Sequence, residues 1–223
     1  MVSNVQVPGT HGHRPLVIAI DGPAGAGKST VGRALAEHLG IAYLDTGAMY
    51  RAMTFAALQR GVVEGDLDEV AAMAPTVDVL IDGDQVYVDG VDATSAIRGR
   101  EVTDAVSQIA ANPAVRDVLV QRQRAWVLER GGGVVEGRDI GSVVFPDAQL
   151  KLYITASARV RAERRVQDIG GDVDEVEASI IKRDRIDSSR DHSPLTETDD
   201  ATTVDTTGMT IDEVVDHILD LLP

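Results

Sequence analysis

The chain has 223 residues, a formal net charge of −15 and only 3 % aromatic residues. Proteins that bind nucleic-acid polymers usually present a basic surface with stacking aromatics, so this composition argues against a polynucleotide partner. The absence of cysteine excludes disulfides and thiolate metal sites and fits a reducing, cytoplasmic location. No apolar run approaches the roughly 20 residues that span a bilayer, so we expect no membrane association.

Residues 1–14 carry neither an apolar core nor a basic start, and we expect them to form a flexible leader before a single domain over 15–223. That domain opens with LVIAID, which predicts a buried strand, and GPAGAGKST follows it. A helix is expected to end at Gly40, a second strand to run through IAYLDTG, and a further helix to end at Gly61. This alternation predicts an α/β fold with a parallel sheet of five strands flanked by helices.

Residues 62 to about 100 break the alternation. The stretch VDVLIDGDQVYVDGVDA has period-two hydrophobicity around a Gly-Asp turn, which predicts an antiparallel hairpin inside an insertion. Two helices are then expected on either side of an Asn-Pro pair, and GGGVVEGRD and AQLKLYIT predict two more strands. A charged helical region follows from about Ser157, and a short strand and an amphipathic helix close the chain.

The glycine-rich loop has the complete pattern of a phosphate-binding loop (P-loop). Its glycines allow successive backbone N–H groups to point inward, and the positive end of the following helix faces the same anion. Lys28 can reach the outer phosphates of a nucleotide triphosphate, and the Ser29 hydroxyl can ligate magnesium. We therefore expect ATP and Mg²⁺ as partners of a P-loop NTPase fold. The loop residues are Gly22, Pro23, Ala24, Gly25, Ala26, Gly27, Lys28, Ser29 and Thr30.

The rest of the chain indicates which class of nucleotide-binding protein uses this P-loop. Switch GTPases read guanine through an Asn-Lys-x-Asp stretch, and neither Asn4 nor Asn112 lies in one. The interpretation that remains is a kinase that transfers a phosphoryl group to a small acceptor. A triphosphate donor and a monophosphate acceptor together bring about six negative charges, which arginines can neutralise bidentately. Local clusters of arginine in an acidic chain therefore favour a nucleotide kinase.

One helix face changes from apolar to charged within DVDEVEASIIKRDRIDSSR. The stripe that contains Val173 and Ile180 continues, at the same spacing, through Arg183, Asp187 and Arg190. Inward-facing charges are costly unless they are paired or bind a ligand. One interpretation is an internal salt-bridge ladder, since Arg183 and Asp187 are four residues apart. The other is the wall of a cleft that contacts phosphate and ribose.

Further candidates lie near strand ends. Arg51 is expected to point inward from the helix after the second strand. Arg138 and Asp139 follow a buried strand, where open α/β sheets bind ligands. An alternative for Asp139 is that it only caps the next segment. Asp21 and Asp45 also end strands beside the P-loop, and either is a candidate to assist magnesium; the sequence does not choose between them.

In chain order, the P-loop, LDTGAMYR, SQIAANPAVRDVLVQRQR, EGRDIGSVVFPDA and KRDRIDSSR closely resemble bacterial cytidylate kinases, from about Leu16 to Pro223. The resemblance implies transfer of the ATP γ-phosphate to CMP or dCMP. It also implies an insertion, roughly 62–100, that binds the nucleoside monophosphate (NMP), and a helical lid, roughly 157–172. We expect small nucleotides as the partners and a monomer as the working form.

The resemblance further implies roles for individual residues. Cytosine recognition would fall on Ser107, Arg116 and Asp139, with Thr46 beside the base. The acceptor phosphate would be held by Arg51, Arg138 and Arg190, and the sugar by Arg183 and Asp187. The lid arginines Arg161 and Arg164 would meet the transferring phosphoryl group. The implied catalytic set is Lys28, Arg138, Arg161, Arg164 and Arg190.

Two alternatives stay open at this point. The first is a P-loop kinase for another small acceptor, such as UMP, AMP or the hydroxyl of a metabolite. The second is a nucleotide-binding regulatory protein without useful turnover. The arginine-rich elements disfavour the second alternative, because a sensor of one nucleotide needs no second anion site.

Overall fold

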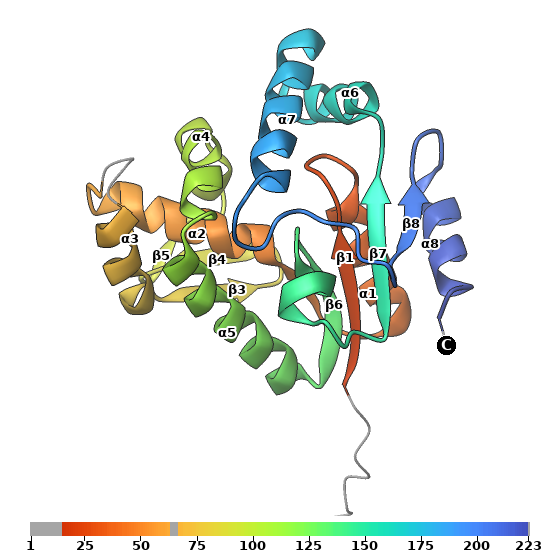
Figure 1. Cartoon of the computed structure of the whole chain (residues 1–223), viewed down its shortest axis with the longest axis horizontal. Helices are drawn as coiled ribbons and strands as arrows, with labels where there is room; N and C mark the ends of the chain where they lie inside the picture. The colour runs from red at the N-terminus through yellow and green to blue at the C-terminus, as the bar shows by residue number, and fades with distance from the viewer. Residues whose placement is uncertain (1–14, 63–66, 223) are drawn as a thin grey trace, which may run out of the picture.

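A five-stranded sheet forms the centre of the protein (Figure 1). The computed structural model describes residues 15–62 and 67–222, so the leader expected over 1–14 lies outside the described residues. The strand order is β2-β6-β1-β7-β8, and every neighbouring pair is parallel, which confirms the predicted sheet. The strands are β1 (Leu16–Asp21), β2 (Tyr43–Asp45), β6 (Gly132–Glu136), β7 (Leu150–Thr155) and β8 (Thr202–Asp205).

Helices cover both faces of this sheet. Alternate side chains of a strand point to opposite faces, so Ile18 and Ile20 of β1 join a core with α1 and α8, whereas Val17 and Ala19 join a core with α2 and α5. Burial on both faces explains why β1 and β6 read as continuous apolar runs. The helices are α1 (Lys28–Leu39), α2 (Thr46–Gln59), α3 (Leu67–Met73), α4 (Arg100–Ile109), α5 (Pro113–Arg130), α6 (Ala158–Ile169), α7 (Val173–Ser188) and α8 (Ile211–Leu219).

The start of α2 differs from the sequence prediction. The second strand was expected to extend through Gly47, but it ends at Asp45, and the helix begins at Thr46. The Asp45 side chain accepts a hydrogen bond from the Ala48 N–H at 3.0 Å and caps the helix, which therefore begins two residues before the expected start at Ala48. This cap places Thr46 directly at the carboxyl edge of the sheet.

The predicted antiparallel hairpin is present, and the same stretch contains a third short strand. Strands β3 (Val79–Asp82) and β4 (Gln85–Val88) pair antiparallel around Gly83, whose φ of 56° suits a tight turn. A short third strand, β5 (Val91–Asp92), extends the sheet. With α3 and α4 it forms the part drawn to the left of the central sheet in Figure 1. Residues 63–66 of the expected insertion lie outside the described residues.

The charged region after β7 divides into two helices. Helix α6 ends at Gly170, and α7 is capped at its start by Asp172. Both helices stand above the carboxyl ends of the central strands (Figure 1). Across the two described stretches of chain, no helix combines the length and hydrophobicity needed to cross a membrane.

Candidate active site

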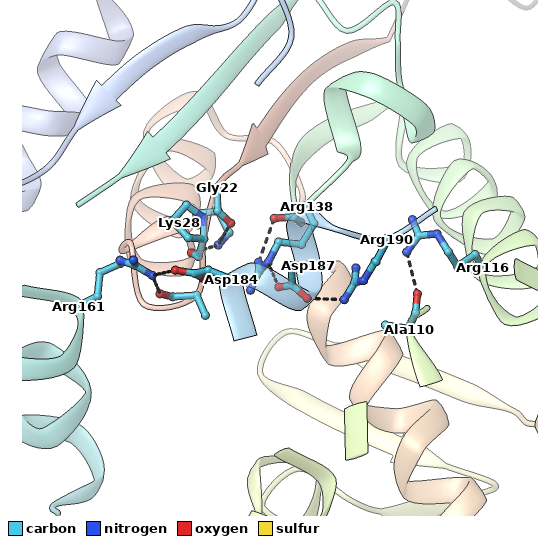
Figure 2. Close-up of polar contacts among 12 residues, drawn as sticks. Gly22, Lys28, Ala110, Arg116, Arg138, Arg161, Asp184, Asp187 and Arg190 are labelled. Atoms are coloured by element: carbon cyan, nitrogen blue, oxygen red, sulfur yellow. Dashed lines mark hydrogen bonds and ion pairs between the residues drawn. The ribbon is translucent and has the colours of Figure 1, made fainter. Parts of the chain in front are cut away.

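The loop between β1 and α1 has the geometry of a phosphate cradle. Gly22 has a φ of +144°, and a Cβ there would lie 2.0 Å from the Ile154 carbonyl oxygen, so only glycine fits. Gly27 caps α1 in the left-handed region, and the helix starts at Lys28. The Lys28 Nζ lies inside the loop and donates to the carbonyls of Gly22 and Pro23, both at 2.8 Å (Figure 2). Burial, and next the charge of Arg138, lower the pKa of Lys28 to about 7.

Glu136, the last residue of β6, meets the loop from the neighbouring strand. Its Oε1 accepts from the Ser29 hydroxyl at 2.6 Å and from the Tyr43 hydroxyl at 2.7 Å. The residue is 3 % exposed, and its Oε2 is buried without a hydrogen-bond partner among the described residues. Burial, and next the charge of Asp45, raise the pKa of Glu136. A buried carboxylate oxygen that none of the described residues contacts by a hydrogen bond, next to the loop serine, is suited to a cation.

Glu136 is absent from the residues predicted from sequence. The sequence feature that could have indicated Glu136 is its place as an acidic residue at the carboxyl end of a strand that is buried throughout. The two predicted magnesium candidates are engaged elsewhere. Asp21 accepts from the N–H groups of Ile140 at 2.8 Å and Gly141 at 2.7 Å. Asp45 caps α2.

Asp187 of α7 organises two of the predicted arginines, as Figure 2 shows. Its Oδ2 accepts from the Arg138 Nε at 2.9 Å, and its Oδ1 pairs with Arg190. Asp187 is 1 % exposed. Burial by itself would raise the pKa of Asp187, but Arg138 and Arg190 hold it below its usual value. The ladder between Arg183 and Asp187 that the sequence left open is not among the ion pairs of the described residues.

Arg183 and Arg51 lie close to this pair of arginines with little compensating charge. Burial, and next Arg138, lower the pKa of Arg183 to about 10, and its Nε has no partner within the described residues. Within the described residues, Arg51 of α2 donates only to neutral groups, the Ile97 carbonyl at 3.2 Å and the Thr103 hydroxyl at 2.9 Å. Burial, and next Arg183, lower its pKa to about 10. We call Arg51, Arg138, Arg183, Asp187 and Arg190 the acceptor cluster.

A second buried ion pair lies beside the acceptor cluster. Arg116 of α5 pairs with Asp139, and their side chains are only 4 % and 5 % exposed. Arg116 also donates to the Ala110 carbonyl at 3.2 Å, and its guanidinium lies 5.4 Å from the centre of the Tyr50 ring. Asp139 makes no side-chain cap to the π-helical turn that follows it, Ile140–Val144, so the capping interpretation is wrong. The pair instead places a carboxylate and a guanidinium side by side.

The two predicted lid arginines of α6 reach the donor side. Arg161 donates to the Ala24 carbonyl of the P-loop at 3.0 Å and pairs with Asp184 at 2.7 Å (Figure 2). Arg164 donates to the hydroxyl of Thr206 at 3.0 Å and to its carbonyl at 2.9 Å. Both guanidinium groups therefore brace α6 against the P-loop and the end of β8.

The comparison with known families decides between the kinds of P-loop protein. The family model described as "Cytidylate kinase" matches residues 18–223. The chain belongs to the cytidylate kinase family. It is 48 % identical over 212 residues to a cytidylate kinase of Mycobacterium leprae, covering 93 % of this chain and 95 % of that protein.

Other members of the cytidylate kinase family are longer. A bifunctional pantoate ligase/cytidylate kinase of a Synechococcus strain is 48 % identical over 219 residues, which is 93 % of this chain but 44 % of that protein. This chain therefore spans less than half the length of such bifunctional relatives. An uncharacterized protein from Eubacterium ventriosum has a solved structure with a TM-score of 0.51 and 16 % identity, covering 93 % of this chain and 98 % of that one, which supports the fold alone.

Two of the residues predicted to bind the base, Thr46 and Ser107, make no hydrogen bond with the acceptor cluster or with the Arg116–Asp139 pair within the described residues. Thr46 is buried, and its hydroxyl donates to the Glu136 carbonyl at 2.6 Å, so it ties the start of α2 to the end of β6. Ser107 lies half-buried on α4. The remaining predicted residues lie around the P-loop, the acceptor cluster or the Arg116–Asp139 pair. A row of cationic groups thus runs from Arg161 to Arg116 (Figure 2).

Proposed function

We propose that this chain transfers the γ-phosphoryl group of ATP to CMP and dCMP, giving CDP and dCDP, by direct in-line attack. The observation that carries the proposal is the pairing of two anion sites at one sheet edge, the P-loop with Lys28 and the acceptor cluster around Asp187. A second anion site is required only if the acceptor is itself a phosphate. This requirement also speaks against a regulatory protein that binds a single nucleotide.

The acceptor would be recognised in three parts. The phosphate fits the cationic groups of Arg51, Arg138 and Arg190, and Asp187 with Arg183 offers acceptors and donors for sugar hydroxyls. The Arg116–Asp139 pair suits a cytosine base, because Asp139 can accept from the exocyclic amino group of cytosine and Arg116 can donate to the ring carbonyl. Uracil carries a carbonyl in place of that amino group, which would face the carboxylate unfavourably.

Magnesium fits the residues beside the P-loop. The Ser29 hydroxyl and the Oε2 of Glu136, which has no hydrogen-bond partner in the described part of the chain, are oxygen ligands of the kind that Mg²⁺ takes from proteins when phosphates supply the rest. When bound, the ion neutralises charge on the phosphate oxygens.

The protein's own residues then perform three tasks. Lys28 and the backbone N–H groups of the loop hold the donor, and the acceptor cluster holds the acceptor phosphate in line with it. No covalent intermediate is needed. The lid, which we assign to roughly 157–172, would exclude water, since water would otherwise compete with the acceptor. The insertion, roughly 62–100, would bind the nucleoside monophosphate.

We also propose that the protein acts on free nucleotides in the cytoplasm as a monomer. The cysteine-free, acidic composition suits that compartment and disfavours polynucleotides.

An acceptor panel tests the function. Release of ADP from ATP would be followed by a coupled assay with CMP, dCMP, UMP and AMP, with and without Mg²⁺, and with Lys28→Ala as the inactive control. We expect CMP and dCMP to give the highest kcat/KM. Preference for another acceptor would favour the alternative kinase, and slow hydrolysis that no acceptor accelerates would favour the regulatory protein.

A further inference from the structure

Asp21, the last residue of β1, stands directly before the P-loop and reaches a segment far away in the chain. It is buried, and each of its carboxylate oxygens accepts a hydrogen bond. Oδ1 accepts from the Ile140 N–H at 2.8 Å, and Oδ2 accepts from the Gly141 N–H at 2.7 Å. These N–H groups lie 119 and 120 positions later, at the start of the turn that follows Asp139. One side chain therefore connects the donor loop to the carboxylate that we assign to the base.

One of these N–H groups is a group that Asp139 could bind itself. An aspartate that precedes a helical turn commonly accepts from the N–H two or three residues later, which here includes the Gly141 N–H. Asp139 makes no such bond to its own turn. Its carboxylate pairs with Arg116, whereas Asp21 takes the Gly141 N–H. The contact from Asp21 thus leaves the Asp139 carboxylate to Arg116 and to the position proposed for cytosine.

The turn after Asp139, residues Ile140–Val144, is closely packed and is held at both ends. A Cβ on Gly141 would lie 3.1 Å from the Lys151 Cδ and 3.4 Å from the Asp21 Oδ2. At the far end, Arg124 of α5 donates to the carbonyls of the last two residues of the turn, both at 2.9 Å. Asp21 therefore fixes the end of the turn that adjoins the base-binding pair, and Arg124 fixes the opposite end.

We propose that Asp21 is a positioning residue, which holds the Asp139 carboxylate at a fixed place relative to the P-loop. The base of the acceptor and the triphosphate of the donor are then bound in register with each other. The inference rests on the function proposed above and deepens it, because it assigns part of the selectivity for CMP to a side chain that binds backbone N–H groups. This role differs from the assistance to magnesium that the sequence left open for Asp21.

Asp21→Asn tests this role. Asparagine has nearly the same size but offers one acceptor oxygen and an amino group that only donates, so one of the two N–H groups loses its acceptor. Asp139 then competes for that N–H, which weakens its pairing with Arg116. The matched control is Arg124→Met, which loosens the far end of the same turn. The assays measure kcat and the KM values for CMP, UMP and ATP, together with the magnesium dependence.

We expect Asp21→Asn to raise KM for CMP at least about tenfold and to lower the CMP/UMP ratio of kcat/KM by a similar factor, since a buried N–H loses its acceptor. KM for ATP and the Mg²⁺ concentration for half-maximal activity should stay within about threefold of the wild type. Arg124→Met should keep the wild-type CMP/UMP ratio. In an Asp139→Asn background, Asp21→Asn should lower that ratio no further, because Asp21 acts through Asp139.

Urea unfolding establishes that each variant is folded before its kinetics are compared. If Asp21→Asn does not fold, Asp21→Ser is measured in its place with the same expectation, since serine keeps one acceptor oxygen in a smaller side chain. An unchanged CMP/UMP ratio in the folded variant would overturn the assignment. A change confined to KM for ATP or to the magnesium titration would also overturn it, because the role would then lie at the donor or the metal.

The control and the double variant give two further ways to refute the role. An equal loss of selectivity in Arg124→Met would indicate a general loosening of the turn, and a further loss in the Asp139→Asn background would show that Asp21 does not act through Asp139. The proposed function itself is judged on the wild type. If the wild type prefers another acceptor, the proposed substrate is wrong, and the same variants are compared on that acceptor and its nearest competitor. A wild type that no acceptor accelerates refutes both proposals.

Discussion

Replacing Asp139 by asparagine should destabilise the fold by leaving Arg116 as an uncompensated buried charge. The side chains of this pair are 4 % and 5 % exposed, which separates it from surface ion pairs worth about 0–1 kcal/mol. Breaking a buried pair costs about 3–5 kcal/mol. We expect the lower end, about 3 kcal/mol, because Arg116 keeps the Ala110 carbonyl and the Tyr50 ring as neighbours.

Urea unfolding at pH 7 measures this loss, and a thermal scan should show a melting temperature lower by about 6–12 °C for a chain of this length. Arg116→Met is the partner variant, since it leaves the carboxylate of Asp139 buried alone. The double variant removes both charges and should recover much of the loss, with a coupling free energy of at least about 2 kcal/mol. The same Asp139→Asn protein should also lose its preference for CMP over UMP.

A coupling free energy below about 0.5 kcal/mol would show that the two side chains are not interdependent and would refute the reasoning from burial. Unchanged CMP/UMP selectivity in a folded Asp139→Asn protein would refute the assignment of this pair to the base, even if the stability result held.

Three further predictions concern the P-loop, its neighbours and one buried carboxylate. Lys28→Ala and Arg190→Ala should each cost at least about 3 kcal/mol of transition-state stabilisation in kcat/KM, and near-normal turnover in steady-state assays would contradict this. Glu136→Gln should raise the Mg²⁺ concentration for half-maximal activity by about tenfold, and an unchanged magnesium titration would exclude Glu136 as a ligand. Burial raises the pKa of Asp21 to about 6, so its contribution to stability is present below the unfolded pKa and is lost as pH rises through 6. Between pH 5 and 7.5 the wild type should therefore lose about 1–1.5 kcal/mol relative to Asp21→Asn, and parallel pH profiles in urea unfolding would refute it.

The sequence predicted those helices, strands and turns that are specified by residues close together in the chain. Buried runs such as LVIAID, glycine stops such as Gly40, and the alternation on either side of Gly83 are set within a few residues, and each appears in the structure where expected. The P-loop belongs to this class as well, because its glycine spacing is readable from sequence, and Gly22 and Gly27 both adopt a positive φ that favours glycine. The inward charged stripe of α7 was also visible as spacing alone, and Asp187 is indeed buried.

The tertiary structure decided which charged groups are partners. Glu136 meets Ser29 across 107 positions of sequence and Tyr43 across 93, and no local pattern encodes such contacts. The spacing of α7 allowed Asp187 to pair with Arg183, but the fold brings Arg138 from the end of β6 to it instead. Likewise, Arg161 and Arg164 were named from the family resemblance alone, and only the packing of α6 on the P-loop and the end of β8 shows which groups they contact. Backbone conformation follows from neighbours in sequence, whereas the partners of a long, charged side chain depend on which elements the sheet order places beside it.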